Sequence, residues 1–255
     1  MAHLRCDFFS DTLGLSTSMT VLLPQPTTAQ IGMGGSGGGD DPPPVLYPLH
    51  GLSDDDTAWL RRTSIERYVA DLRLAVVMPQ VHRGFYLDGA HTGAYWTFLS
   101  EERPAVVQRF FRVTDSREDT FVAGLSMGGY GAMLSALRRP DRFAAAASLS
   151  GALDVGGLQA EDGHGVFHHV LDGPAAGSDA DLFALLDRAE PGAVPPLYVR
   201  CGTQDGLVEQ SRRFVTHARS RGLDVTAGLD PGDHEWDYWD RTIQDVLAWL
   251  PIRTR

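Results

Sequence analysis

The sequence predicts one α/β domain with a mostly parallel central sheet and helices on both of its faces. After residue 45, short apolar segments alternate with amphipathic ones, an order typical of parallel strands joined by helices. The chain has 255 residues, 43% hydrophobic and 22% charged, which suits a single domain with a large core. We find no internal repeat and therefore treat residues 1–255 as one domain.

Strands are predicted wherever short apolar runs are bounded by turn-forming residues. Residues 3–9 and 17–23 flank a turn at residues 11–14 and predict two antiparallel opening strands. The following runs predict buried strands: 45–49, 74–78, 121–123, 144–149, 197–201 and 223–227. Residues 33–44 combine glycines with three consecutive prolines, so we expect a flexible surface loop there. A phosphate-binding loop is rejected, because no strand precedes the glycines and prolines follow them.

Amphipathic or helix-forming runs occupy much of the remaining chain. We expect helices at residues 68–72, 104–112, 179–190, 207–221 and 236–250, and one that follows Ser126 and ends at residue 138. Thr63 or Ser64 could cap the first of these, and Ser178 or Asp179 the helix at 179–190. Residues 85–95 lack a period and predict a loop over the site. Residues 151–190 begin with a glycine- and histidine-rich stretch and predict an excursion that forms part of a cap.

Composition excludes several classes of function. A formal net charge of −11 would repel nucleic acid and anionic membranes, so neither is expected as a partner. No apolar run reaches the length of a membrane span, and the N-terminus lacks the layout of a signal peptide. The cysteines, Cys6 and Cys201, are too few for a disulfide framework and are expected to be small buried residues. Together these features favour a cytoplasmic protein.

The stretch Gly124-Leu125-Ser126-Met127-Gly128 carries the strongest chemical signal in the chain. It is a G-x-S-x-G motif between a predicted strand and a predicted helix, the context of a nucleophile elbow in the α/β-hydrolase fold. A serine at the tip of such a turn is exposed to a base and to substrate, whereas Cβ atoms at positions 124 and 128 would clash. A chance match is the alternative in a glycine-rich chain, but the flanking pattern favours a functional elbow.

An elbow serine requires a base and an acid, which follow it in the order Ser, Asp/Glu, His. Asp205 follows the predicted strand at 197–201, and His234 follows the strand at 223–227. Both therefore lie at the carboxyl ends of strands, where an open parallel sheet presents its site. Asp205 could also cap the helix that begins near residue 207. The competing histidines lie inside a predicted helix or before the acid in the chain: His217, His164, His168 and His169.

Two backbone N–H groups are expected to bind the oxyanion of a tetrahedral intermediate. One belongs to Met127, which follows the nucleophile. The other is assigned to Leu52, because the sequence His50-Gly51-Leu52 follows an earlier strand and the glycine lets the backbone turn inward. The sequence thus predicts a site of Ser126, Asp205 and His234, with Leu52 and Met127 as oxyanion donors.

These motifs together resemble the esterase D-like serine hydrolases. The resemblance rests on His50-Gly51-Leu52, on residues 124–132 and on Asp233-His234-Glu235-Trp236, with weaker similarity in residues 85–104. The tributyrin (acetyl) esterase branch is the most similar, and it is related to carbohydrate esterase family 1, the S-formylglutathione hydrolases and the antigen 85 mycolyltransferases. The resemblance implies an α/β-hydrolase fold, metal-free hydrolysis of short-chain acyl esters without a cofactor, and the five site residues given above.

Several alternatives remain open at this stage. The loop after Leu52 lacks the cysteine of the S-formylglutathione hydrolases, which weakens a thioesterase assignment, while feruloyl and acetyl-xylan esterases are further candidates. A non-catalytic binding module on the same scaffold is a rival of another class. The acidic run at residues 54–56 is read as solvated rather than as a metal site. Trp59, Trp96, Trp236 and Trp239 could line a pocket, although core packing is their more frequent role. A small-molecule ester is the expected partner, and the sequence leaves open whether the chain forms a homo-oligomer.

Overall fold

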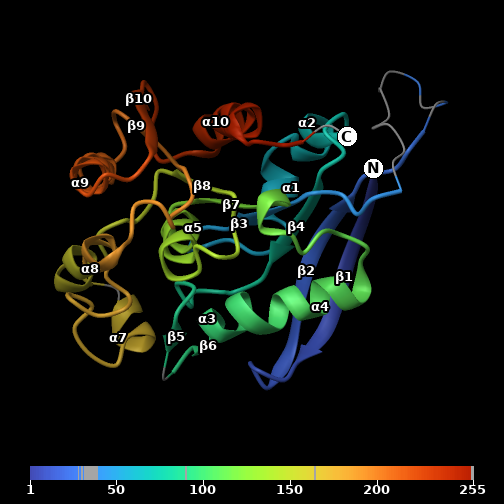
Figure 1. Cartoon of the computed structure of the whole chain (residues 1–255). Coiled ribbons are helices and arrows are strands. Elements are labelled where there is room, and N and C mark those ends of the chain that lie inside the picture. The colour runs from blue at the N-terminus through green and yellow to red at the C-terminus, as the bar shows by residue number, and fades with distance from the viewer. Residues whose placement is uncertain (28, 30, 32–39, 90, 164, 254–255) are drawn as a thin grey trace.

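A computed structural model describes residues 1–27, 29, 31, 40–89, 91–163 and 165–253 of the chain. The described residues form an eight-stranded sheet in the order β1-β2-β4-β3-β7-β8-β9-β10 (Figure 1). Its strands are β1 (Ala2–Ser10), β2 (Leu15–Leu23), β3 (Val45–Leu49), β4 (Ala75–Pro79), β7 (Thr120–Leu125), β8 (Ala145–Leu149), β9 (Leu197–Gly202) and β10 (Val225–Asp230). The mostly parallel α/β sheet expected from the sequence is confirmed.

Strand direction changes only at the beginning of the sheet. β1 pairs antiparallel with β2 in a register that runs from Ala2 opposite Leu23 to Ser10 opposite Leu15, and β2 pairs antiparallel with β4. From β4 to β10 every neighbouring pair is parallel. The carboxyl ends of β3, β7, β9 and β10 therefore point to the same edge of the sheet, which brings the loops that follow them together.

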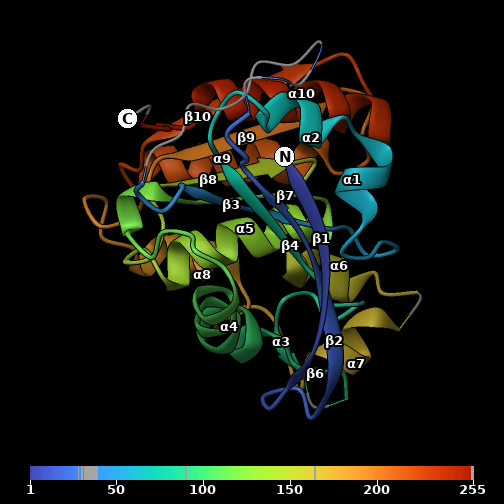
Figure 2. The same cartoon turned by 90° about the vertical axis from the view of Figure 1, so that its right-hand side faces the viewer.

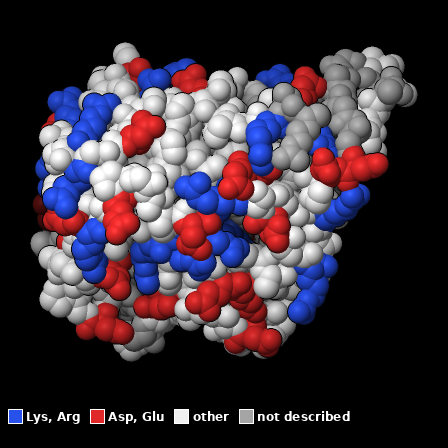
Figure 3. All heavy atoms as spheres, in the orientation of Figure 1, with Lys and Arg blue, Asp and Glu red and all other residues white. Residues whose placement is uncertain are grey.

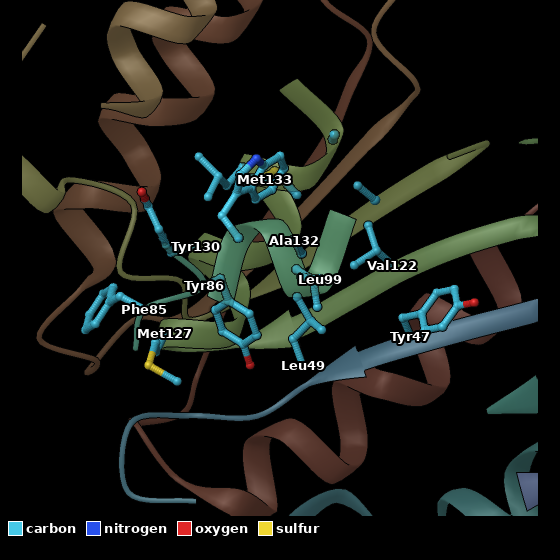
Figure 4. Packing of buried hydrophobic residues seen from close by; sticks show 14 of the residues in the cluster. Tyr47, Leu49, Phe85, Tyr86, Leu99, Val122, Met127, Tyr130, Ala132 and Met133 are labelled. Atoms are coloured by element: carbon cyan, nitrogen blue, oxygen red, sulfur yellow. The ribbon is translucent and has the colours of Figure 1, made fainter. Parts of the chain in front are cut away.

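Helices cover both faces of the sheet (Figure 2). One face carries α1 (Ala58–Arg62), α2 (Ile65–Val69) and α10 (Trp236–Trp249), whose side chains share a core cluster with Leu46, Phe121 and Tyr198. The opposite face carries α4 (Arg103–Phe110), α5 (Met127–Arg138), α8 (Leu182–Arg188) and α9 (Val208–Ser220). In that second cluster Tyr130 and Met133 belong to α5, and Tyr86 packs against this helix (Figure 4). None of the described helices combines the length and the apolar character that a membrane span requires.

Several predicted boundaries were wrong, and their errors have physical causes. The helix expected at 104–112 ends a longer helical segment made of α3 (Tyr95–Thr97), the π-helix η1 (Phe98–Glu102) and α4. Its buried residues Tyr95, Trp96, Phe98 and Leu99 have no clear 3.6-residue period, because the wider π turn shifts the apolar face. The helix expected to start after Thr63 or Ser64 and to continue through residues 68–72 is α2, which ends at Val69, three residues earlier than expected; α1 was not predicted.

Of the expected helix caps, one was right in position and one was wrong. Ser64 stands at the N-cap of α2, as expected, although it forms no side-chain capping hydrogen bond. Asp181, not Ser178 or Asp179, caps α8 by accepting a hydrogen bond from the N–H of Phe183. The misassignment at α8 follows from a helix start that the sequence pattern placed about three residues before the real one.

Two segments near the site contain more structure than the sequence predicted. The loop expected at 85–95 includes a short ladder of β5 (Asp88–Gly89) and β6 (Gly93–Ala94), and its Phe85 and Tyr86 are buried. The excursion expected at 151–190 carries α6 (Val155–Ala160) and α7 (Val166–Val170) before α8. The remaining short helix is the 3-10 turn η2 (Arg117–Asp119). Most of the loop predicted at 33–44 lies outside the described residues.

The turn at Ser126 joins β7 to α5 with the close backbone approach that the motif predicts. A Cβ atom on Gly124 would lie 2.1 Å from the carbonyl oxygen of Gly128, and one on Gly128 would lie 2.1 Å from that of Leu49. These neighbours are backbone atoms, which cannot move aside as a flexible side chain can. Ser126 itself adopts φ +53°, a strained value for a residue with a side chain. Glycine at positions 124 and 128 therefore fixes the separation of β3, β7 and α5.

Gly124→Ala tests this packing. We expect a loss of at least about 1–3 kcal/mol in the free energy of unfolding, the usual cost of overpacking a core. Chemical denaturation measures it, and Gly192→Ala is the matched control, because a Cβ there meets no heavy atom within 4 Å. Equal stability of the two variants would contradict the proposed steric constraint.

Candidate active site

Three side chains from distant parts of the chain meet at the carboxyl edge of the sheet. The Nε2 atom of His234 lies 3.1 Å from Oγ of Ser126, and its Nδ1 atom lies 2.8 Å from Oδ2 of Asp205. Ser126 follows β7, Asp205 follows β9 and His234 follows β10. The structure thus brings the three predicted residues into one hydrogen-bonded chain. In this arrangement the imidazole can take a proton from the hydroxyl while the carboxylate stabilises the resulting charge.

Asp205 is buried, and its carboxylate has more than one partner. Its side chain has 0% exposed surface, and Oδ1 accepts a hydrogen bond of 2.8 Å from the N–H of Leu207. Burial by itself raises the pKa of Asp205, but hydrogen bonds from His234 and from the Leu207 N–H outweigh it and hold the pKa below its usual value. The carboxylate therefore binds a backbone N–H just before α9 and also orients the imidazole. The sequence suggested both roles for Asp205.

Aromatic packing supports the imidazole of His234 from α10. The ring of Trp239 lies edge to face against it, with 4.9 Å between centroids, and Trp239 in turn contacts Trp236. The side chain of His234 remains 35% exposed, so substrate can reach it. Asp233 accepts a hydrogen bond from the backbone N–H of His234, which leaves the ring to Asp205. The sequence left open whether the tryptophans line a pocket or pack in the core. Trp59, Trp96 and Trp239 are buried, which indicates that packing is their main role.

The two expected oxyanion donors lie beside the serine. Met127 is the first residue of α5, so its N–H has no acceptor inside the helix and lies at the positive end of the helix dipole. Leu52 and Met127 both line the same cavity as Ser126. Gly51 approaches the turn so closely that a Cβ there would lie 2.9 Å from Leu125 and 3.8 Å from Cβ of Ser126. These positions suit the oxyanion role, which stays a prediction.

His50 holds the loop that carries Leu52, and the sequence reading assigned it no role of its own. Its Nε2 accepts a hydrogen bond of 3.1 Å from the N–H of Val81, so Nδ1 carries the proton and donates to the carbonyl of Gly51 at 2.8 Å. In a trans peptide the N–H points opposite the carbonyl, so this bond directs the N–H of Leu52 away from the imidazole. The hydroxyl of Tyr86 also donates to the carbonyl of His50.

Burial keeps His50 neutral. The side chain is 1% exposed, and burial lowers its pKa below the ordinary value, although the Gly51 carbonyl and nearby aspartates act in the opposite direction. The sequence did contain a signal that His50 positions the loop with Leu52, because this histidine directly precedes the flexible Gly51. Recognising it requires knowing that the N–H of Val81, 31 residues later, reaches the ring.

The other candidate histidines and the acidic run lie elsewhere. His217 in α9 pairs with Asp187 at 2.9 Å, and His168 and His169 belong to α7, while His164 lies outside the described residues. The acidic run at 54–56 is not simply solvated, contrary to expectation. Asp56 is 2% exposed and accepts hydrogen bonds from the hydroxyls of Ser18 and Thr20, which ties the run to β2. Cys201 is buried as expected, whereas Cys6 is partly exposed.

A cavity of about 280 Å³ opens beside Ser126. Most of its walls are apolar and come from five parts of the chain: Leu52, Phe85, Met127, Ala152 to Phe167 (with Leu158 and Val166) and Leu207. Its charged lining residues are Glu161 and Asp162. Asp162 is held in place because its carboxylate accepts the N–H groups of Val166 and Phe167 at the start of α7. The excursion therefore forms one wall of the cavity, beside the loop that contains Phe85.

Comparisons with known proteins agree with this geometry. The family model Esterase, described as "Putative esterase", matches residues 12–250. An acetyl esterase of Caldicellulosiruptor saccharolyticus is 29% identical over 98% of both chains. Among solved structures, a fluorophosphonate-binding serine hydrolase F of Staphylococcus aureus, with substrate bound, is 31% identical over 98% of each chain, with a TM-score of 0.85. An S-formylglutathione hydrolase of Staphylococcus aureus has the same identity and coverage, with a TM-score of 0.84. The chain therefore belongs to the Esterase family of serine hydrolases and has their α/β-hydrolase fold.

Proposed function

We propose that this protein is a serine carboxylesterase that hydrolyses neutral, short-chain acyl esters through an acyl-enzyme. The observation that carries the proposal is the hydrogen-bonded chain from Ser126 through His234 to the buried Asp205. These three groups supply the nucleophile, the general base and the orienting carboxylate that nucleophilic acyl transfer uses. A binding module would have no need of a strained serine aligned with a base. The proposed partner is a small-molecule ester, with no part for nucleic acid or membrane.

The proposed reaction has two halves. Oγ of Ser126 attacks the ester carbonyl while Nε2 of His234 takes the hydroxyl proton, and the oxyanion is bound by the N–H groups of Met127 and Leu52. When the tetrahedral intermediate collapses, the alkoxide leaves with the proton from His234 and the acyl group stays on Ser126. A water molecule then repeats the attack with His234 as base, which releases the carboxylic acid and restores the serine.

The cavity supports the choice of substrate. Its volume of about 280 Å³ and its apolar walls suit an acetyl or butyryl group with a modest leaving group. Glutathione is a net anion at neutral pH, and the charged groups lining this cavity are both carboxylates. An S-formylglutathione substrate, which the name of one relative suggests, would therefore be repelled at the wall formed by α6 and α7. Feruloyl and acetyl-xylan esters are neutral and remain the second candidate class.

Ser126→Ala and His234→Ala test the mechanism with p-nitrophenyl acetate and butyrate as substrates. Each should lower kcat by about 10⁴-fold or more, because members of such a triad act as a unit. His217→Ala is the matched control, since that histidine also pairs with an aspartate but lies in α9, away from Ser126. Turnover by Ser126→Ala at the normal rate would refute the serine mechanism.

His50→Ala tests the oxyanion loop. We expect kcat to fall by up to about 10²-fold with a smaller change in KM, because a misdirected N–H weakens binding of the transition state most. The folded-state pKa of His50 lies below its ordinary value of about 6.5, so the unfolded chain binds the proton more readily. Its contribution to stability is therefore complete above that value and is lost as the pH falls below it. The variant should lose this part of the pH dependence of unfolding; an unchanged kcat would count against the assigned role.

Substitution of Glu161 tests the acidic wall. p-Nitrophenyl butyrate and mono-p-nitrophenyl succinate differ mainly in a terminal carboxylate, so the ratio of their kcat/KM values isolates the effect of charge. Glu161→Gln should improve the succinate relative to the butyrate by about threefold to tenfold, since unit charges a few ångströms apart in water interact by ~1 kcal/mol. Glu190→Gln, also exposed but outside the cavity lining, is the control. A ratio that is equal in all three proteins would show that charge at this wall does not select the substrate.

A further inference from the structure

Arg103, at the start of α4, is a buried cation without a carboxylate partner. Its exposed fraction is 3%, and no described acidic residue forms an ion pair with it. Nε donates to the carbonyl of Leu99 at 3.1 Å, while Nη1 is buried with no hydrogen-bond partner among the described residues. Burying a charge usually requires a partner that compensates the lost hydration. The lost hydration of the Arg103 guanidinium must therefore be compensated by other groups.

The nearest compensation within the protein is aromatic and too weak. The guanidinium carbon lies 3.6 Å from the centre of the Tyr47 ring, whose place on β3 is visible in Figure 4. A cation–π contact of this kind stabilises by about 2 kcal/mol when desolvated. Desolvation of a guanidinium costs several kcal/mol. The difference leaves a positive site that would attract an anion.

Neighbouring charges increase the positive potential. Burial lowers the pKa of Arg103 to about 10, with a further contribution from the nearby Arg142, so Arg103 remains a cation at neutral pH. Arg139 lines a small cavity together with Arg103 and Arg142, but it is paired with Asp141 at 2.9 Å. That surface carboxylate also attracts Arg142, yet forms no bond with Arg103. Glu101 also acts on Arg139, and Asp115 borders Arg103 and Arg142 on the other side, but none of these carboxylates forms an ion pair with Arg103 among the described residues.

Two small adjoining cavities meet at Arg103, and both are also lined by Pro104, Arg142 and Phe143. The first has a volume of about 10 Å³ and is further lined by Ser100, Ser135 and Arg139, without an acidic residue. The second, of about 20 Å³, is bordered by Asp115, which disfavours an anion there. The first cavity is about large enough for one water-sized particle, so an ion of the size of chloride, which is somewhat larger, would have to displace the lining side chains slightly. It is too small for phosphate or a metabolite carboxylate.

We propose that Arg103 and Arg142 bind a small monovalent inorganic anion, of the size of chloride, in the cavity between α4 and the end of α5. Nη1 of Arg103 supplies the buried donor, and the hydroxyl of Ser100 lies in the same lining. Ser135 is already committed as a donor to the carbonyl of Gly131. The negative end of the α5 dipole opposes an anion here, whereas the guanidinium groups of Arg103 and Arg142 attract it. The bound ion would fasten α4 to α5, the helix that begins at Ser126.

Bromide provides a direct test, because it replaces chloride and scatters anomalously. Crystals soaked in sodium bromide should show an anomalous peak in the cavity lined by Arg103, Arg142 and Ser100. Absence of a peak at this place would overturn the proposal, since the cavity would then hold water only. A peak in the crystal must also be matched by binding in solution; otherwise it represents an adventitious ion only.

Thermal unfolding measures binding in solution. At constant ionic strength, replacing gluconate, which is too large for the cavity, by chloride at ten times its Kd should raise Tm by about 3–6 °C. Arg103→Met should abolish this chloride-specific increase, whereas Arg109→Met, an exposed position on the same helix, should retain it.

The readout is the difference between the two salts, because removal of a buried charge can change Tm by itself. If Arg103→Met does not fold, the half-buried Arg142→Met serves as the second variant and should reduce the increase. An equal chloride effect in the foldable variant and the wild type, or no chloride effect at all, would overturn the proposal.

Discussion

The close approach of three backbones at Ser126 is the constraint on which the rest of the site depends. Gly124, Gly128 and the carbonyl of Leu49 lie so near one another that no side chain fits between them. The indole of Trp59 also donates to that carbonyl, so the end of β3 is held from both faces of the sheet. This contact places the loop with Leu52 and the first turn of α5 beside one strained serine. In the mechanism that we propose, the reacting groups are then positioned before substrate arrives, which is how such sites lower the barrier.

The buried acid and the buried histidine at this point each have specific partners. Asp205 is buried but receives two donors, and neutral His50 uses both ring nitrogens. Asp56, far from the chemistry, accepts two hydroxyl donors. Arg103 differs, because its buried guanidinium has an aromatic ring and one carbonyl but no opposite charge among the described residues. That contrast, rather than burial alone, distinguishes Arg103 as a place where a ligand from solution would complete the structure.

Relatives of this family share the fold but carry names that imply different acyl and leaving groups, from acetyl esters to S-formylglutathione. In this chain the cavity walls come from segments outside the sheet, namely the loop with Phe85 and the excursion with Leu158, Glu161 and Val166. Such segments can change without disturbing the strands that hold Ser126 and His234. Specificity within the family is therefore expected to reside in these walls, and we propose that the charge at Glu161 favours neutral substrates in this chain.

The sequence alone was enough to predict the fold class and the three candidate catalytic residues. The glycines at 124 and 128 are typical of a tight turn with a close backbone approach. Short apolar runs predict the parallel strands. Residues that follow β9 and β10 lie at the same edge of a parallel sheet. Those rules depend on backbone sterics and on periodicity, so they were sufficient for the fold and for the choice of Ser126, Asp205 and His234. Helix boundaries were less accurate, because the π turn at Phe98–Glu102 and the cap at Asp181 depend on neighbours outside the local pattern.

Other features required the folded chain. The hydrogen bond from Val81 to His50, the burial of Asp56 beneath β2 and the placement of Arg103 against Tyr47 each join residues that are far apart in sequence. The charge and hydrogen-bonding state of a buried group depend on whichever groups surround it in three dimensions. Sequence spacing carries no record of those distances, and for that reason packing decided which polar side chains became partners and which one was left with a positive charge to neutralise.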